Sequence, residues 1–193
     1  VYFNTAYGPI KLDDNDLSAQ LLDGFMNAKY SDMAKYCILW EAGAYNPYAL
    51  ESMEKYFAPY IIENFFKDPR YMVIDNQPVI CMFSPGSYKN TIGGAEKMKE
   101  SFDYLENEAK KLGFDGVIYI ACANSSKDLA DCGFDGCYAY SWGTSGNKAS
   151  VNIESISNSA SEGSVYTVPT VSVGFDSMPW HGKRYGLISL SDY

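Results

Sequence analysis

The chain of 193 residues is long enough to bury a core and is most simply one domain. Its 47% hydrophobic and 20% charged residues exclude a disordered or collagen-like chain. A formal net charge of −9 without a basic stripe argues against a nucleic-acid partner. No apolar run approaches the roughly 18 residues that a transmembrane helix requires. The chain begins at Val1 without a methionine or signal peptide, so we expect it to be part of a longer parent chain.

The first forty residues predict a loop, a helix and a buried strand. Residues 1–14 are interrupted by a Gly-Pro pair and have no clear periodicity, which favours a loop. A helix is expected from Asp16 to Met26, because its apolar residues recur on one helical face. The apolar run 35–40 then predicts a strand, and Glu41 follows it directly.

A longer helix and a central strand come next. Asn46-Pro47 is a helix-starting pair, and apolar residues at helical spacing continue to Phe65, with a kink expected at Pro59. Asp68-Pro69 ends this helix, since proline disfavours helical backbone in the residue before it. After the turn residues 75–77, the run 79–83 is apolar at every position, as in a strand buried on both faces.

The second half of the chain repeats a strand-entry turn. Residues 84–94 are rich in Gly, Ser and Asn and predict a loop, and a helix is expected from 95 to 112. The motif Gly-Phe-Asp-Gly then occurs at 113–116 and at 133–136, each time before an apolar strand. Two strands that enter by the same turn after a helix are expected to be parallel neighbours. The remaining expected elements are strands 117–121, 137–140 and 167–173, a short helix 125–129 and a Ser-rich helix 151–161.

This alternation predicts an α/β fold with a parallel sheet. The two candidates are an open doubly wound sheet and a (β/α)8 TIM-type barrel. No glycine-rich phosphate-binding motif follows any strand, which argues against nucleotide binding. A full barrel needs about 250 residues, so we expect a single barrel-type domain that is partial or contracted.

The five cysteines predict no disulfide framework and no metal site. They form an odd set without a closely spaced metal-type pair. Cys37, Cys81, Cys122 and Cys137 fall within predicted buried strands, where cysteine behaves as a small hydrophobic residue. The cellular compartment stays open, with a preference for the periplasm or the cell exterior. No cofactor is expected.

Candidate functional residues follow the predicted strands, since the carboxyl ends of barrel strands form the active-site face. All three tryptophans of the chain are among them, which favours a sugar-binding face, although tryptophans at a barrel rim can also be core residues. The predicted substrate-binding residues are Trp40, Tyr45, Tyr88, Asn124, Ser141, Trp142 and Trp180.

Glu41 and Asp176 are the predicted catalytic carboxylates. Glycoside hydrolysis generally requires one carboxyl group to protonate the leaving oxygen and a second to act as base or nucleophile. Both residues stand at predicted strand ends beside aromatic residues, and burial against an aromatic ring raises a carboxyl pKa. Structural alternatives are a salt bridge for Glu41 and a turn or cap for Asp176. The single histidine, His181, does not suggest a triad or a metal site.

Several segments resemble the glycoside hydrolase family 99-like group, which includes WbsX-like proteins. They are DPRYMVIDNQPV, YCILWEAG, GFDGCYAY and VPTVSVGFDSMPW, and the similarity extends from about Leu21 to Trp180. The resemblance implies a (β/α)8 barrel that acts on glycans. True family 99 endo-α-mannosidases have two glutamates three residues apart. Glu41 matches the first, whereas Ala44 stands at the second, and the group's late Trp-Asn-Glu-Trp strand is absent from these residues.

Three functions stay open at this stage. The first is a glycoside hydrolase acting on mannan-like or related oligosaccharides, with an oligosaccharide or polysaccharide as its partner. The second is a non-catalytic glycan-binding module, which the missing second glutamate favours. The third is a glycosyltransferase of polysaccharide biosynthesis, for which the chain lacks a recognisable phosphate-binding loop.

Overall fold

The computed structural model describes residues 2–5, 24–41, 50–140, 149–170 and 182. Within these ranges the core of the molecule is a seven-stranded sheet with the order β1-β2-β4-β5-β6-β7 and β3 paired to β4. The strands are β1 (Tyr2–Thr5), β2 (Cys37–Glu41), β3 (Val73–Ile74), β4 (Gln77–Phe83), β5 (Ile118–Cys122), β6 (Gly136–Tyr138) and β7 (Tyr166–Thr167). All of the pairings are parallel except that of β3 with β4.

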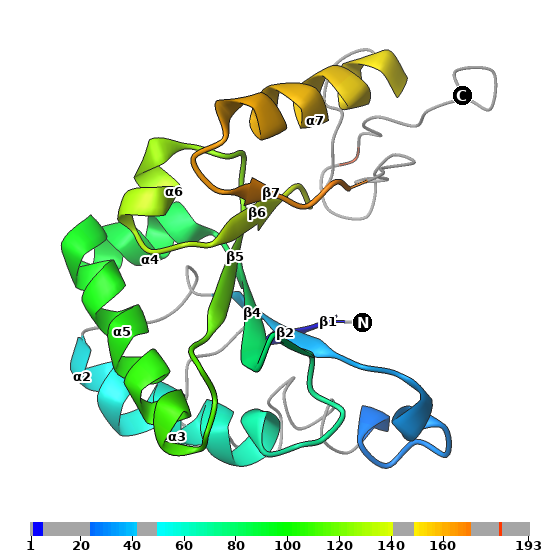
Figure 1. Cartoon of the computed structure of the whole chain (residues 1–193), viewed down its shortest axis with the longest axis vertical. Coiled ribbons are helices and arrows are strands. Elements are labelled where there is room, and N and C mark those ends of the chain that lie inside the picture. Colours follow the sequence, from blue (N-terminus) through cyan, green and yellow to red (C-terminus); the bar gives the residue numbers. More distant parts are fainter. Residues whose placement is uncertain (1, 6–23, 42–49, 141–148, 171–181, 183–193) are drawn as a thin grey trace.

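Helices follow most of these strands and cover one face of the sheet. They are α2 (Leu50–Ser52), α3 (Ala58–Ile61), α4 (Pro85–Ile92), α5 (Ala95–Lys111), α6 (Lys127–Asp131) and α7 (Ala149–Glu162). Figure 1 shows α2 to α5 on the same side of the sheet, with α7 beside β7. The π-helical segments Met53–Phe57 and Ile62–Phe66 continue α2 and α3, and Pro59 lies in the first turn of α3.

The strand order identifies the fold as part of a (β/α) barrel. The described parallel strands follow one another across the sheet in chain order, from β1 to β7. A doubly wound sheet would instead reverse its strand order at a switch point. The prediction of a partial TIM-type barrel is therefore confirmed, and the carboxyl ends of the described parallel strands all lie at one edge of the sheet.

The repeated Gly-Phe-Asp-Gly motif does start neighbouring parallel strands, as predicted. Gly113 and Gly133 both have positive φ angles, near 94° and 91°, which glycine adopts at a helix end without the steric cost of a side chain. The carboxylate of Asp135 then accepts a hydrogen bond from the Tyr119 backbone N–H at 2.8 Å. This bond joins the beginning of β6 to β5.

Two segments that were predicted to be loops form regular structure. Residues 2–5 are the parallel strand β1, because they pair with Cys37–Trp40 of β2. Residues 85–92 are the helix α4, which begins with Pro85 and ends before Gly93 in the left-handed conformation. Tyr88 and Ile92 bury the inner side of this helix, so packing outweighs its low intrinsic helix propensity.

The other boundaries shift by a few residues. Of the predicted strand 167–173, residues 168–170 are not part of β7, which covers Tyr166–Thr167, and residues 171–173 lie outside the described part of the chain. The predicted helix 125–129 begins at Lys127, after Ser126 caps it by accepting a hydrogen bond from the Leu129 N–H. Most of the predicted helix from Asp16 to Met26, and the Asn46-Pro47 cap, lie outside the described residues.

Candidate active site

Glu41 is the last residue of β2 and stands at the carboxyl edge of the sheet. Its Cα is paired with that of Phe83, the last residue of β4, and its side chain is half-buried. In the next strand pair, Cys122 of β5 lies opposite Tyr138 of β6. The ends of four adjacent strands therefore bring a carboxylate, a thiol and two aromatic rings to one edge.

The pKa of the Cys122 thiol depends on neighbouring groups at this edge of the sheet. Burial is the main reason why its pKa is raised, and the negative charge of Glu41 raises it further. Hydrogen bonds from the Tyr140 backbone and the Tyr138 side chain act in the opposite direction. Glu41 and Cys122 are therefore close enough to interact, although one lies on β2 and the other on β5.

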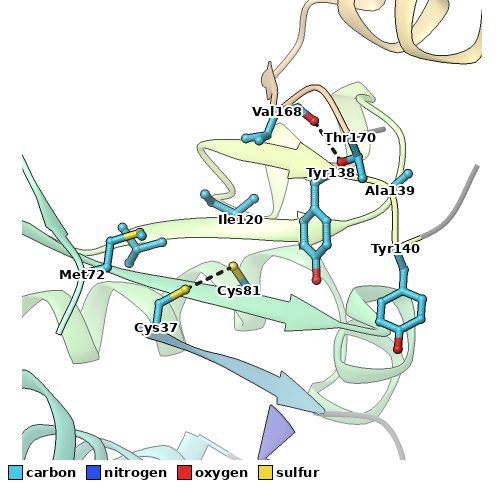
Figure 2. Close-up of a pocket in the computed structure, with 10 residues that line it drawn as sticks. Cys37, Met72, Cys81, Ile120, Tyr138, Ala139, Tyr140, Val168 and Thr170 are labelled. Carbon is cyan, nitrogen blue, oxygen red and sulfur yellow. Dashed lines mark hydrogen bonds between the residues drawn. The ribbon is translucent and has the colours of Figure 1, made fainter. Parts of the chain in front are cut away.

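A cavity of about 320 Å³ extends along one face of the sheet, from Cys37 at the start of β2 to Tyr138 and Tyr140 near the carboxyl strand ends, and Glu41 is not among the residues that line it. Figure 2 shows its walls, which are mainly apolar, with the Tyr138 and Tyr140 rings near the ends of the strands. It is lined by Cys37, Met72, Val79, Cys81, Ile120, Tyr138, Ala139, Tyr140, Val168 and Thr170. A largely apolar cavity with polar groups at its edge is the usual form of a small-molecule site.

Tyr140 is an aromatic residue of this edge that sequence reasoning missed. It is 54% exposed, and its ring meets the Phe83 ring edge-on at a centroid distance of 5.5 Å. An exposed aromatic ring held in place by a second ring is suited to stacking on a sugar. Its position two residues after Tyr138 was a usable signal, since alternate residues of a strand point to the same face.

Trp40 and Tyr88 have a different role from the one predicted. Both side chains are buried, with 0% and 1% exposure. The Trp40 ring stacks on Phe57 at 4.0 Å and meets Tyr88 edge-on at 4.8 Å, and the Tyr88 hydroxyl donates to Ser101 Oγ at 3.1 Å. The predictions that Trp40 stacks on a sugar and that Tyr88 hydrogen-bonds its hydroxyl groups are corrected, because both side chains are buried against the helices and are not accessible to a ligand.

The remaining predicted site residues stay predictions. Asn124 is exposed just after β5, at the same edge as Glu41. Five residues lie outside the described part of the chain: Tyr45, Ser141, Trp142, Asp176 and Trp180.

Within the described ranges, no group of three or more His, Cys, Asp or Glu side chains is arranged to hold a metal ion. No helix there is both long and apolar enough to cross a membrane.

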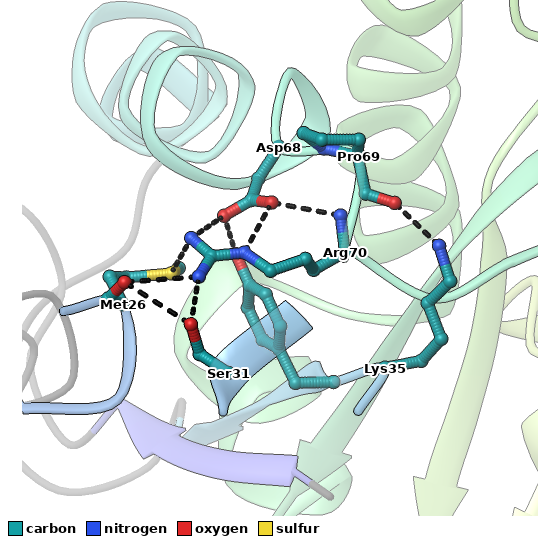
Figure 3. Close-up of polar contacts among 7 residues, drawn as sticks. Met26, Ser31, Lys35, Asp68, Pro69 and Arg70 are labelled. Atoms are coloured by element: carbon teal, nitrogen blue, oxygen red, sulfur yellow. Dashed lines mark hydrogen bonds and ion pairs between the residues drawn. The ribbon is translucent and has the colours of Figure 1, made fainter. Parts of the chain in front are cut away.

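The segment Asp68-Pro69-Arg70-Tyr71 lies at the other end of the sheet and has a structural role. Arg70 donates to both carboxylate oxygens of Asp68, from Nε to Oδ1 at 3.0 Å and from Nη2 to Oδ2 at 2.7 Å. Its Nη1 donates to Ser31 Oγ at 2.6 Å and to the Met26 carbonyl at 3.0 Å. Figure 3 shows Arg70 at the centre of this cluster.

Pro69 and Tyr71 of this segment also form hydrogen bonds to residues distant in the sequence. Pro69 accepts a hydrogen bond from Lys35 Nζ through its carbonyl oxygen. The buried Tyr71 hydroxyl donates to the Val79 carbonyl at 2.7 Å, which connects the segment to β4. Hydrogen bonds with Arg70 hold the pKa of Asp68 below its usual range. The pKa of the nearby Tyr36 hydroxyl is raised, mainly by burial and then by the negative charge of Asp68.

Comparison with known proteins agrees with this architecture. The similar solved structures include two of the family 99 endo-α-mannosidase from Bacteroides thetaiotaomicron. One, in complex with bis-tris propane, has 18% identity and a TM-score of 0.55, over 87% of this chain and 51% of that chain. The other has 21% identity and a TM-score of 0.55, over 88% and 49%. The similarity shows a shared barrel fold, and this chain spans about half the length of these enzymes.

The family model for glycosyltransferase WbsX matches residues 30–180. The match covers most of the chain, which therefore belongs to the WbsX family, as the sequence segments suggested. No curated protein matches the chain.

Proposed function

We propose that the protein is a carbohydrate-active enzyme of the glycoside hydrolase type, with Glu41 as a catalytic carboxylate. The observation that carries the proposal is the position of Glu41 at the carboxyl end of a central parallel strand. This is the edge at which barrel enzymes place their catalytic groups. The half-buried carboxylate, the exposed Tyr140 ring and the neighbouring cavity give this edge the ingredients of a sugar site.

The role of Glu41 follows from the chemistry of the glycosidic bond. A carboxylic acid can protonate the leaving oxygen, and a carboxylate can activate water or attack the sugar carbon. Hydrolysis requires a partner for Glu41, and we propose Asp176 as the second acidic or substrate-positioning residue. Trp142, Trp180, Tyr45, Asn124 and Ser141 remain the proposed substrate contacts, and Tyr140 joins them.

The family 99 neighbours support α-mannose-containing oligosaccharides as the first substrates to test. These neighbours are endo-α-mannosidases, and this chain shares their fold. The experiment is to incubate the full protein with α-mannan oligosaccharides and measure new reducing ends, with the Glu41→Gln variant in parallel. We expect release by the wild type and a large loss in the variant. Equal release by both would reject Glu41 as a catalytic residue.

Two other outcomes correspond to the alternative functions. Oligosaccharide binding by calorimetry, without hydrolysis or transfer, would instead identify a non-catalytic glycan-binding module. Transfer of sugar from a nucleotide sugar to an acceptor would identify a glycosyltransferase, which the description of the family model favours. Measurement of nucleotide-sugar binding separates this function from hydrolysis, because a hydrolase needs no activated donor.

A further inference from the structure

Two thiols lie close together in the cavity on the inner face of the sheet. Cys37 of β2 and Cys81 of β4 have their sulfur atoms 4.0 Å apart, and both side chains are buried at 5% and 8% exposure. Figure 2 shows the two thiols pointing toward one another, with the Met72 thioether on the Cys37 side of the same cavity. The glycan chemistry proposed for the carboxyl edge uses none of these three sulfur atoms.

The backbone spacing argues against a disulfide between the two cysteines. Cys81 is paired in register with Leu39, so Cys37 lies two residues away along the neighbouring strand. Adjacent strands are about 4.8 Å apart and two residues extend about 6.6 Å along a strand, so the two Cα atoms are about 8 Å apart. A disulfide requires Cα atoms within about 7 Å, so the sheet would have to distort to form one.

The same spacing suits a single ion bound between the two sulfur atoms. Metal–thiolate bonds are about 2.3 Å long, so two such bonds in line separate the sulfurs by about 4.6 Å. Small side-chain rotations would open the present 4.0 Å to that distance. Thiolate and thioether ligands in an apolar environment select soft ions, among which Cu(I) is the common biological one.

We propose that Cys37 and Cys81 form a two-thiolate site for a soft monovalent cation of the Cu(I) class, with Met72 as a weak third ligand. Binding requires the two thiols to release their protons to solvent, and Cu(I) keeps its oxidation state, so no oxidant or reductant takes part. The three sulfur atoms line the cavity that adjoins the proposed sugar site, but the inference does not require that glycans bind or react there.

The test is an anaerobic titration of the reduced, full protein with Cu(I) in competition with bicinchoninate. We expect one equivalent to bind, with sulfur-only coordination in the X-ray absorption spectrum. Cys37→Ala and Cys81→Ala should each weaken binding by at least about 100-fold, since even indirect partners of a metal ligand contribute 10- to 100-fold. Met72→Leu should cause a smaller loss. Cys132→Ser is the matched control, because this cysteine is also buried but does not line the cavity.

Three results would overturn the proposal. One is binding of less than one equivalent to wild-type protein whose circular dichroism shows an intact fold. The second is equal Cu(I) affinity in wild type and in the Cys37→Ala/Cys81→Ala double variant, which would place the ion elsewhere. The third is a Cys37–Cys81 disulfide found by mass spectrometry after exposure of the apoprotein to air, because the proposal rests on a strand spacing that permits a disulfide only if the sheet distorts.

Discussion

The two ends of the parallel sheet are built differently. At the amino end, the charges of Asp68 and Arg70 meet in a network whose side chains are only 12% and 23% exposed. At the carboxyl end, the Glu41 carboxylate is half-buried beside a cavity, and the Tyr140 ring is 54% exposed. The difference indicates that one end holds the strands and helices together while the other presents groups to a ligand. This division of roles is typical of barrel enzymes.

The segment Asp68-Pro69-Arg70-Tyr71 belongs to the structural end of the sheet. It was one of the most recognisable family signatures in the sequence, yet it lies far along the strands from Glu41. Its hydrogen bonds link residues 26 and 31, the start of β2 and the start of β4. A family signature can therefore mark the scaffold rather than the reaction.

The largest expected effect is on catalysis at the carboxyl end. Glu41→Gln should lower the turnover of a responsive glycan by about 10²- to 10⁴-fold, because amide cannot donate or accept the required proton. The free energy of unfolding should change by no more than about 1 kcal/mol, because Gln keeps the size of the half-buried side chain. Turnover and urea unfolding are measured on the same samples. Glu54→Gln, at an exposed helical position, is the matched control and should leave both unchanged.

The converse substitution at the amino end should affect stability. Arg70→Met removes the donors to Asp68, Ser31 and the Met26 carbonyl, and leaves the largely buried Asp68 carboxylate without its cation. We expect a loss of about 2–3 kcal/mol in the free energy of unfolding, as for hydrogen bonds to charged groups. The turnover number of the folded fraction should not change. A loss of turnover without a loss of stability would contradict the division between the two ends.

Low pH should reduce the free energy of unfolding by protonating Asp68 at the amino end of the sheet. The pKa of Asp68 is lower in the folded chain than in the unfolded chain. Ionised Asp68 therefore contributes fully to stability above its ordinary pKa of about 3.9. This contribution is lost as the pH falls through the folded-state pKa. Asp68→Asn should therefore cost about 1–2 kcal/mol near pH 7 and progressively less below pH 4. Urea unfolding of both proteins across this range measures the difference. A difference that grows toward low pH would be inconsistent with the ion pair.

The smallest expected effect is on substrate binding at Tyr140. Tyr140→Ala should raise KM by about 3- to 10-fold with little change in kcat, which corresponds to the 0.5–1.5 kcal/mol of an aromatic contact. Tyr166→Ala is the control, because Tyr166 is also exposed, at 71%, but belongs to β7 and does not line the cavity. Steady-state kinetics on the responsive glycan separates the two parameters. An equal change in both variants would exclude a specific role for Tyr140.

Much of the fold was predictable from the sequence because its central strands are continuous apolar runs. The run 79–83 became β4, and the repeated Gly-Phe-Asp-Gly turn correctly indicated that β5 and β6 are parallel neighbours. Residues 2–5 and 85–92 were missed, since their composition resembles that of loops. Both are stabilised by partners distant in sequence: β1 by pairing with β2, and α4 by burial of Tyr88.

The sequence by itself determined that its continuous apolar runs are strands and that Glu41 stands at the carboxyl end of one of them. It could not determine which face of β2 meets the helices, because a strand buried on both faces has no polar alternation to distinguish them. Only the tertiary structure decided that Trp40 points under the helices onto Phe57, and that Cys37 points to the opposite face, toward Cys81. The physical reason is that side-chain direction alternates along a strand, whereas the covered face depends on where the following helices pack.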